Sequence, residues 1–423
     1  MAPNPAIIQA VEQLGYRVTV GDVATQAGFD INLARQQLLA LATGVGAHMQ
    51  VAESGEIVYL FPQSLRAVLR NKFLRLRLQE WGKILWQVLF YLIRISFGIL
   101  LLGSLALITL AILIIIMVHE VTSDDDNFAP TSWISPSWFD VFSPNYDRRN
   151  QERRQAEIQL NEQQEKQEEK NQLNFLEAIF SFLFGDGNPN ADLEERRQKA
   201  IVAVIHNNHG AVVAEQIAPY LDDLGSGYAQ EYEDYMLPVL TSFNGQPTVS
   251  HEGHLVYVFP ELQATASSQQ QEVSTQYFLE EIPQKFSAAS PGAIALSAIL
   301  GLLNLAGAVY LESLLVKEIM ENGSVLPLAH NICLLLLGYG TAFVGIPLGR
   351  YFWLKRHNKK ICDRNAQRQE RSLLLADAAV QGKVDYARQF ATQTIISEGD
   401  LVYTTETDLM EQESNAIAKL TAV

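Results

Sequence analysis

Three stretches of the chain are apolar for long enough to cross a lipid bilayer. The clearest runs from Phe97 to Val118, 22 residues without a charged side chain, which as a helix matches the ~30 Å hydrocarbon layer of a membrane. Two further stretches, 293–316 and 326–349, are interrupted by polar residues. The pattern predicts three transmembrane helices, of which the last two form an antiparallel hairpin.

Glu312 and His330 are the ionisable side chains inside this predicted hairpin. Burying a charge in lipid is costly, so such residues are candidates for a function, and these two could face each other across the hairpin. The alternative is that both lie near helix ends and reach water. Two spacings of small residues would let helices approach closely, although they are common by chance: Ser297 with Gly301, and Gly345 with Gly349.

Basic residues gather immediately before the first span, at Arg66, Arg70, Lys72, Arg75, Arg77 and Lys83. We expect a basic amphipathic juxtamembrane helix over 64–96 that contacts anionic lipid headgroups and keeps the N-terminus cytoplasmic. A second basic cluster, 350–360, follows the third span and also favours the cytoplasmic side. Three spans that alternate in direction would put the two clusters on opposite sides of the membrane. The apolar stretch 173–184 is too short to span and is interpreted as an interfacial or domain-packing helix. The side of the C-terminal tail therefore stays open.

Two segments outside the predicted spans share the same order of helix-like and strand-like hydrophobic patterns. Residues 6–62 predict a helix, a strand, two helices and a hairpin, the order of a winged helix, and residues 199–259 repeat it. VTVGDVA at 18–24 aligns with VVAEQIA at 212–218, and GEIVYLFP at 55–62 with GHLVYVFP at 253–260. We therefore predict an internal duplication, and the fold class α+β: duplicated winged-helix-like modules joined to an α-helical transmembrane region.

The predicted division of the chain follows from these patterns. The segments are a first module (1–63), the juxtamembrane helix (64–96), a first transmembrane helix (97–118), an aromatic and then charged linker (119–172), an amphipathic helix with the second module (173–262), a linker (263–292), two transmembrane helices (293–316 and 326–349) and a C-terminal tail (350–423). The third helix of the second module is expected over 230–243. A GDLVY motif at 399–403 predicts a truncated third module in the tail.

Charge disfavours nucleic acid as a partner. The chain holds 31 Lys and Arg against 47 Asp and Glu, a formal charge of -16. The first module has two arginines against five carboxylates, and residues 196–262 of the second have three basic residues against eight acidic ones. Phosphates would be repelled from both, so a membrane-bound transcription regulator is only a second alternative. Cys333 and Cys362 form no CxxC motif, which leaves no cysteine-rich cluster site.

Histidines supply the one metal-like pattern, HNNH at 206–209 and HEGH at 251–254. A zinc site would use His206, His209, His251 and His254. In the predicted fold the two pairs lie toward opposite ends of a small sheet, so exposed turn histidines are the favoured interpretation. Motifs for a nucleophile, a P-loop or a dinucleotide are absent, and we expect neither an enzyme nor a cofactor. The GDGNPN turn at 185–190 lacks the ligand spacing of an EF-hand, which favours a structural turn.

The wings ending in VYLFP and VYVFP, the FLFGDGNPN turn and the three apolar segments together resemble a family of cyanobacterial membrane proteins. Its chloroplast relatives in plants carry the label iron-sulfur cluster biosynthesis. The resemblance implies an integral protein of the plasma or thylakoid membrane of a cyanobacterium. Two cysteines are too few to scaffold a cluster directly.

The leading hypothesis is a non-enzymatic membrane protein whose acidic modules dock partner proteins, as an assembly or biogenesis factor. The alternative is a metal or iron-sulfur biogenesis component. Membrane lipids are the other expected partner. The identity of the protein partners and the oligomeric state stay open.

Overall fold

The computed structural model describes residues 4–72, 74–122, 175–250, 253–266, 274–322, 327–408 and 410. The chain forms two compact units. The head unit consists of Met1–Ile84, Asn188–Pro283 and His357–Val423, and the membrane unit of Leu85–Gly187 and Gln284–Arg356. The chain therefore passes between the units four times. Residues 123–172 of the predicted linker lie outside the described part of the chain.

The first half of the head is built around three helices and a hairpin. Its elements are α1 (Pro5–Gln13), β1 (Arg17–Val18), α2 (Val20–Ala27), α3 (Ile31–Val45), β2 (His48–Ala52) and β3 (Ile57–Leu60). Thr19 and Asp22 form a capping box at the start of α2, and Gly28 ends that helix in the left-handed conformation. The apolar faces of the helices meet under the hairpin in one core that includes Ile7, Val23, Leu38, Leu41 and Phe61.

The second half repeats this order with one difference. Its elements are α10 (Leu193–Asn207), β4 (Ala211–Val212), α11 (Ala214–Ile217), η3 (Ala218–Tyr220), α12 (Tyr228–Glu231), η4 (Asp234–Met236), α13 (Leu237–Phe243), β5 (Gln246–Val249) and β6 (Leu255–Val258). The single helix expected over 230–243 is wrong. The backbone of Glu233 has a φ of 56°, in the left-handed region, which interrupts a right-handed helix, and Pro238 stands in the first turn of α13.

Strand pairing is the same in both halves. In the first, Leu60 on β3 lies opposite Arg17 on β1 and His48 on β2. In the second, Val258 on β6 lies opposite Ala211 on β4 and Gln246 on β5. Both sheets thus place the last strand of the hairpin between the other two, in the orders β1-β3-β2 and β4-β6-β5.

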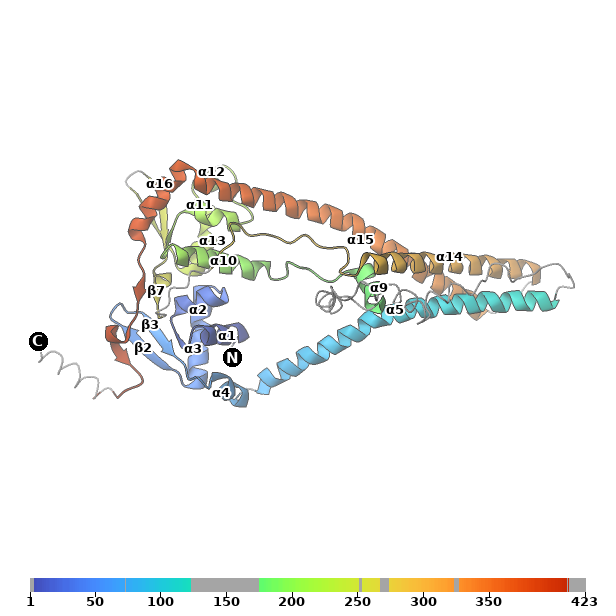
Figure 1. Ribbon diagram of the computed structural model, residues 1–423, viewed down its shortest axis with the longest axis horizontal. Helices are drawn as coiled ribbons and strands as arrows, with labels where there is room; N and C mark the ends of the chain where they lie inside the picture. The colour runs from blue at the N-terminus through green and yellow to red at the C-terminus, as the bar shows by residue number, and fades with distance from the viewer. Residues whose placement is uncertain are drawn as a thin grey trace, which may run out of the picture. The chain divides into compact units, whose positions relative to one another are not determined.

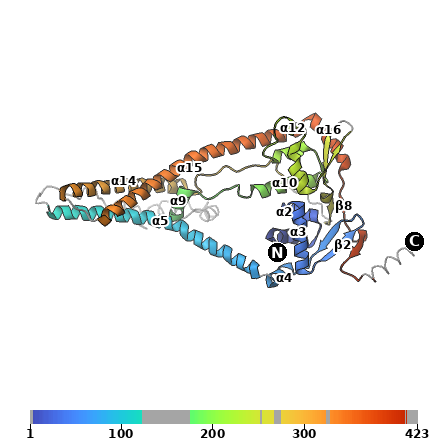
Figure 2. The ribbon, with the colours of Figure 1, turned by 180° about the vertical axis from the view of Figure 1, so that it is seen from behind.

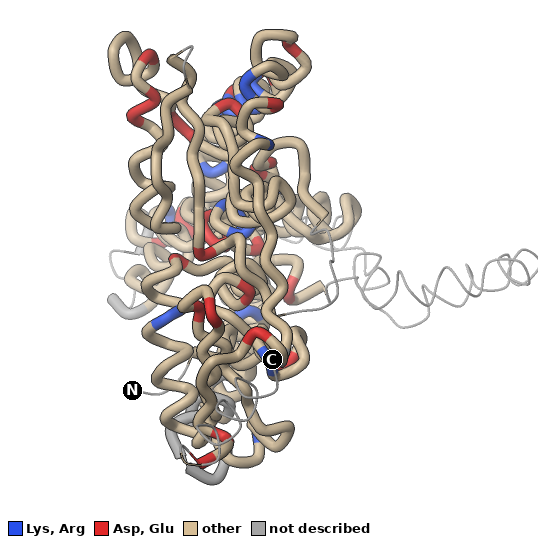
Figure 3. Tube along the Cα trace, turned by 90° about the vertical axis from the view of Figure 1, so that its left-hand side faces the viewer, with Lys and Arg blue, Asp and Glu red and all other residues tan. Residues whose placement is uncertain are grey.

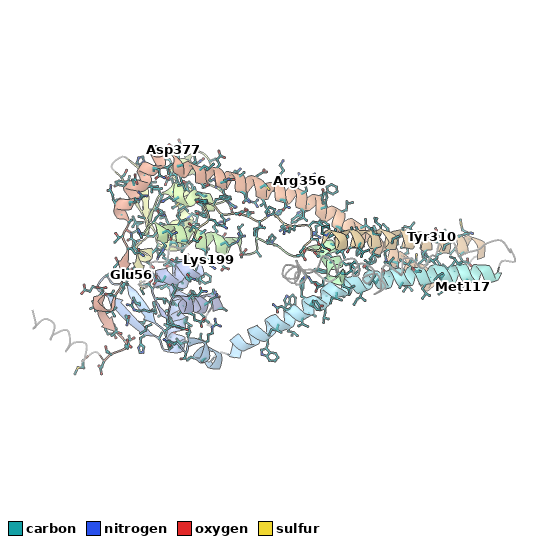
Figure 4. All side chains as sticks on the ribbon, in the orientation of Figure 1. Glu56, Met117, Lys199, Tyr310, Arg356 and Asp377 are labelled. Atoms are coloured by element: carbon teal, nitrogen blue, oxygen red, sulfur yellow. The ribbon has the colours of Figure 1, made fainter. Side chains whose placement is uncertain are left out.

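Residues of the first half enter the hydrophobic core of the second. Ala24, Ile31 and Ala34, from α2 and α3, belong to the same buried cluster as Ile201 and Ile205 of α10. Figure 2 shows α2 beside α10. The approach is close, because a Cβ at Gly28 would overlap the side chain of Lys199, which Figure 4 labels on α10.

Polar contacts close the same interface. The Thr19 hydroxyl donates to the Ala264 carbonyl at 3.2 Å, and the Ala266 amide donates to the Asp22 carboxylate at 2.9 Å. Arg35 forms an ion pair with Glu261 at 2.5 Å. Helices α2 and α3 of the first half are therefore partly buried inside the head.

The C-terminal segment adds a strand to the sheet of the first half and forms a small two-stranded sheet with the segment after the second. Its elements are η6 (Leu374–Ala376), α16 (Ala378–Ala387), η7 (Arg388–Phe390), β8 (Thr394–Ile395), η8 (Glu398–Asp400) and β9 (Leu401–Thr404). Strand β9 pairs antiparallel with β2, and β8 pairs parallel with β7 (Ala264–Thr265), which follows η5 (Pro260–Leu262). Among the described residues the GDLVY motif thus completes the sheet of the first half, and the tail forms no sheet of its own.

A buried arginine joins the end of α15 (Pro327–Leu373) to the second half of the head. The Arg368 side chain is 1% exposed and donates to the Glu281 carboxylate at 2.7 Å, and also to Asp222. Arg364 donates to Glu281 as well. Burial by itself would raise the pKa of Glu281, but hydrogen bonds and positive charge from Arg364 and Arg368 outweigh it and hold that pKa below its usual range. The carboxylate is therefore charged at neutral pH and neutralises the buried arginine.

The membrane unit contains α9 (Phe175–Phe184), α14 (Pro291–Asn322) and parts of α5 (Leu74–Thr122) and α15. Three helices are long and apolar enough to cross a membrane, over Ile84–Met117, Pro291–Met320 and Ala329–Ala376. The expected juxtamembrane helix over 64–96 is instead α4 (Leu65–Lys72) and the beginning of α5. Leu65 and Leu69 of α4 are buried in the core of the first half, so α4 belongs to the head.

Helices α5 and α14 run parallel, and α15 runs antiparallel to α14 (Figure 1). Ser104 contacts Asn304, and Ile108 lies against Gly307, so positions on α5 and α14 advance together. Phe343 packs on Gly301, whereas His330 meets Glu312 farther along α14. The starts of α5 and α14 and the exit of α15 therefore lie at one end of the bundle. The basic residues at the start of α5 and those after Arg350 on α15 both follow from that end, whereas the side of the membrane on which they lie stays a prediction.

One of the two small-residue spacings marks a helix contact. Ser297 is fully buried, and a Cβ at Gly301 would overlap the ring of Phe343 on α15. Around Gly345 and Gly349 a Cβ would meet no described atom within 4 Å. The GxxxG spacing on α15 is thus not a contact between the described helices.

The fold predicts that all parts of the head lie on one side of the membrane. Single cysteines at the exposed positions Ser54, Ser226 and Thr407, in a chain whose two native cysteines are replaced by serine, should react equally with a membrane-impermeant maleimide in intact cells or vesicles. Labelling of Ser226→Cys from the side opposite to Ser54→Cys would contradict the parallel arrangement of α5 and α14.

Glu281→Gln should destabilise the protein by about 3 kcal/mol at pH 7, because it leaves the buried Arg368 without its full counter-charge. The pKa of Glu281 is lowered in the folded state, so its stabilisation is complete above the ordinary value of 4.5 and is lost as the pH falls below it. Unfolding followed by circular dichroism between pH 3 and 7 measures both effects. The control Asp385→Asn removes an exposed ion pair with Arg388 and should cost less than about 0.5 kcal/mol.

Candidate functional site

The turn after α9 places a carboxylate at one end of the membrane bundle. Gly185 has a φ of 81°, which turns the chain sharply so that Asp186 points back toward α9. One oxygen of Asp186 accepts from Arg94 of α5 at 3.1 Å. The other accepts from the Ser181 hydroxyl at 2.5 Å and from the Ala288 amide at 2.7 Å. Asp186 thus joins α5, α9 and the segment before α14.

Arg350 brings α15 to the same place. Its guanidinium donates to the carbonyls of Phe182 at 2.9 Å and Ser181 at 3.3 Å, both in the last turn of α9. The Ser181 carbonyl also accepts from the Gly185 amide at 2.8 Å. It also lies over the Phe286 ring, 4.4 Å from the centroid. We call Arg94, Ser181, Asp186 and Arg350 the charge node. Donors already use both oxygens of Asp186, in agreement with a structural turn.

The charge node places α9 in the membrane unit. Ile179, Phe182 and Leu183 of α9 pack with Leu101 of α5 and Leu300 of α14. The grouping of this helix with the second module, over 173–262, is therefore wrong, although its interpretation as a packing helix agrees with the structure. Two features of the sequence could have indicated the charge node: the glycine-rich acidic turn after α9, and the lone arginine Arg94 at the edge of an apolar run.

A polar pair lies within the bundle beyond the charge node. Asn304 is fully buried and donates to the hydroxyl of Ser104. The Oδ1 atom of Asn304 has no hydrogen-bond partner among the described residues. It lies close to Gly340 on α15, since a Cβ added to that glycine would be 3.2 Å from it. In an apolar environment such a pair favours one alignment of α5 against α14, since sliding either helix would leave both polar groups unpaired.

Glu312 and His330 meet near the opposite end of the bundle, as the sequence predicted. The His330 Nδ1 and Glu312 Oε1 atoms are 3.5 Å apart, and the two side chains are 38% and 22% exposed. Cys333 is buried beside them and donates to the Ala308 carbonyl at 3.8 Å. Among the described residues no three His, Cys, Asp or Glu side chains gather in a way that could hold a metal ion. The two side chains form a close pair, although His330 Nδ1 makes no hydrogen bond with any described residue.

The predicted metal ligands lie in two separate places. His206 is half-buried at the end of α10, where burial lowers its pKa, and His209 is exposed in the following turn. His254 precedes β6 at the tip of the hairpin, about 13 Å along the strand from Val258, which pairs with Ala211. His251 lies outside the described residues.

The predicted lipid-binding residues divide between α4 and α5. Arg66 on α4 donates to both carboxylate oxygens of Glu12 on α1, each at 2.7 Å, so its charge is neutralised within the head. Arg70 and Lys72 follow on α4, and Arg75, Arg77 and Lys83 begin α5. In Figure 3 acidic and basic positions are interleaved along the trace. Lipid contact by the residues other than Arg66 stays a prediction.

Asp186→Ala should lower the free energy of unfolding by about 2–4 kcal/mol, because it leaves a buried serine hydroxyl, an amide and Arg94 without their acceptor. Thermal unfolding in detergent or nanodiscs measures the change. Asp192→Ala is the matched control, since Asp192 is 58% exposed and forms an ion pair with Arg196 one helical turn away. Equal effects of the two substitutions would show that the charge node does not hold the bundle together.

Comparison with known proteins places the chain in a family. No family model and no solved structure matches it. A protein of Arabidopsis thaliana described as "Uncharacterized protein At5g03900, chloroplastic" is 34% identical over 431 aligned positions, which cover 96% of this chain and 79% of the relative. That description carries no iron-sulfur label. With this identity over nearly its whole length, the chain belongs to the same family as the chloroplastic Arabidopsis protein.

Proposed function

We propose that this protein is a non-enzymatic integral membrane protein whose head docks partner proteins at a thylakoid-type membrane, as an assembly or biogenesis factor. The observation that carries the proposal is the core of the second half, which residues of the first half enter. Helices α2 and α3, the counterparts of the reading helices of a DNA-binding winged helix, contribute Ala24, Ile31 and Ala34 to that core. Their burial and the acidic charge of both halves favour protein partners over DNA.

The two halves of the head are best explained as duplicated winged-helix-like modules. Equal element order, equal strand order and equal register at Leu60 and Val258 support this origin. In the joined modules each half keeps its own core, and Ala24, Ile31 and Ala34 of the first half are buried in the core of the second. Such a head offers a rigid surface for recognition, which suits docking better than a flexible pair of domains would.

The membrane helices would hold this surface at one face of the bilayer. The basic positions before α5 and after Arg350 flank the same end of the bundle, and positively charged flanks favour the cytoplasmic or stromal side. A chloroplastic relative fits a thylakoid-type membrane. We therefore propose that the N-terminus and the head lie on the cytoplasmic or stromal side of the membrane.

Affinity-tagged full-length protein, crosslinked in membranes and solubilised, should migrate in native gels as an assembly larger than its 47.2 kDa chain. The same preparation should bind a 30-base-pair DNA duplex no better than bovine serum albumin does at 150 mM salt. Mass spectrometry of the crosslinked assembly identifies the partners. Migration of the crosslinked chain alone, or salt-sensitive DNA binding, would overturn the proposal.

A further inference from the structure

The second half of the head contains a segment that the first half lacks. In the first half α2 is joined to α3 through 28–30, whereas 221–236 separate η3 from α13 in the second half. We call residues 221–236 the insert. No residue of α12, the helix inside it, is buried, and Met236 is its one fully buried side chain. The core therefore does not require most of the insert, and such surface elaborations of a repeated fold commonly carry function.

Two tyrosines of the insert stack on each other in water. Tyr228 and Tyr232, one turn apart on and just after α12, are 78% and 64% exposed, with ring centroids 6.0 Å apart and an interplanar angle of 16°. Two large rings exposed side by side offer a partner a contiguous apolar contact surface. The stack holds both ring faces in a fixed orientation, so a partner would lose little entropy on meeting them.

The charge around these tyrosines is acidic. Residues 222–234 contain five carboxylates and no Lys or Arg. Asp222 is bound by Arg197 and Arg368, and Glu233 accepts from the Tyr257 hydroxyl at 2.7 Å. Glu231 and Asp234 are exposed and form no ion pair with any described residue. Two carboxylates beside the rings are thus available to a cation.

A hollow at the base of the insert adds a place for a long side chain. It is lined by acidic, polar and apolar residues of α10, the insert and α13, including Asp223, Asp234 and Tyr235. Arg197 also lines it, and its guanidinium is paired with Glu194 and Asp222. An arginine or lysine has an apolar stem and a charged head, which matches such a lining. Phosphates and anionic lipids would be repelled by the same carboxylates.

We infer that Tyr228, Tyr232, Glu231 and Asp234 form a docking surface for an arginine- or lysine-rich segment of a partner protein. Guanidinium groups stack on tyrosine rings and donate to carboxylates, so both features of the insert recognise one chemistry. The inference rests on the proposed docking function and names the chemistry of the partner. The surface distinguishes the second half of the head from the first.

The test uses the full chain in nanodiscs of neutral lipid and a fluorescein-labelled (Arg-Gly-Ser)₄ peptide at 150 mM salt, where long-range attraction is screened. Tyr228→Ala with Tyr232→Ala should weaken binding of the peptide, measured by anisotropy, about tenfold. The control Tyr277→Ala removes a separate tyrosine that is 88% exposed, and should leave the affinity unchanged. Equal affinities of the double variant and the wild type would overturn the inference.

A charge-matched pair tests the carboxylates. Glu231→Gln with Asp234→Asn should weaken binding about fivefold, whereas Glu406→Gln with Asp408→Asn, exposed carboxylates elsewhere in the head, should have no effect. If both double variants lost affinity for the peptide equally, the effect would come from the net charge of the chain, and the inference would be overturned.

Crosslinking in membranes separates this inference from the proposed function. Loss of a wild-type partner from the tyrosine double variant, with crosslinked peptides rich in Arg and Lys, supports the surface. Unchanged partner capture by the double variant would leave the docking function in place and refute this surface. Capture of no partner by the wild type would refute the docking function itself. Crosslinks from the insert to the chain's own segment 148–154 would show that the occupant is internal, against the inference.

Discussion

The membrane unit depends on the carboxylate of Asp186. It accepts hydrogen bonds from Arg94, Ser181 and the amide of Ala288, while Arg350 binds the carbonyls of the helix that precedes it. At the end of a bundle of apolar helices water competes weakly for these groups, so each hydrogen bond counts for more than it would on an exposed surface. Four segments that are distant in the sequence therefore meet at one point. These polar contacts specify the position of α9 more sharply than its apolar contacts do, because dispersion attraction has little directional preference.

This arrangement has a consequence for the head. The chain leaves the membrane unit near residues 84, 187, 283 and 356, and the starts of α5 and α14 and the exit of α15 all lie at the charge-node end of the bundle. Three separate segments can then fold together into one head. The parallel arrangement of α5 and α14, aligned by the buried Ser104–Asn304 pair, is what permits this, since alternating helices would send one segment to the opposite side.

Inside the head, the entry of first-half residues into the core of the second half turns two similar halves into one body. Close approach at Gly28, polar contacts from Thr19 and Asp22, and the ion pair of Arg35 with Glu261 fix the halves against each other. The C-terminal strand β9 adds a further edge to the first sheet. The burial of α2 and α3 that results favours a protein-docking role, and it leaves the insert with Tyr228 and Tyr232 as the part of the second half that has no counterpart in the first.

Much of the local structure follows from the sequence alone. Long apolar runs determine the membrane helices, because nothing else satisfies a backbone in lipid, and period and turn residues determine the helices and hairpins of the head. The facing of Glu312 and His330 also followed, since a short connection forces a hairpin. The pairing of elements that are far apart in the chain did not follow from the sequence. The break at Glu233, the parallel pairing of α5 with α14, the joining of β9 to β2 and the binding of Arg350 to α9 each depend on contacts between residues far apart in the chain. Local periodicity carries no information about such partners, and only tertiary packing decides among them.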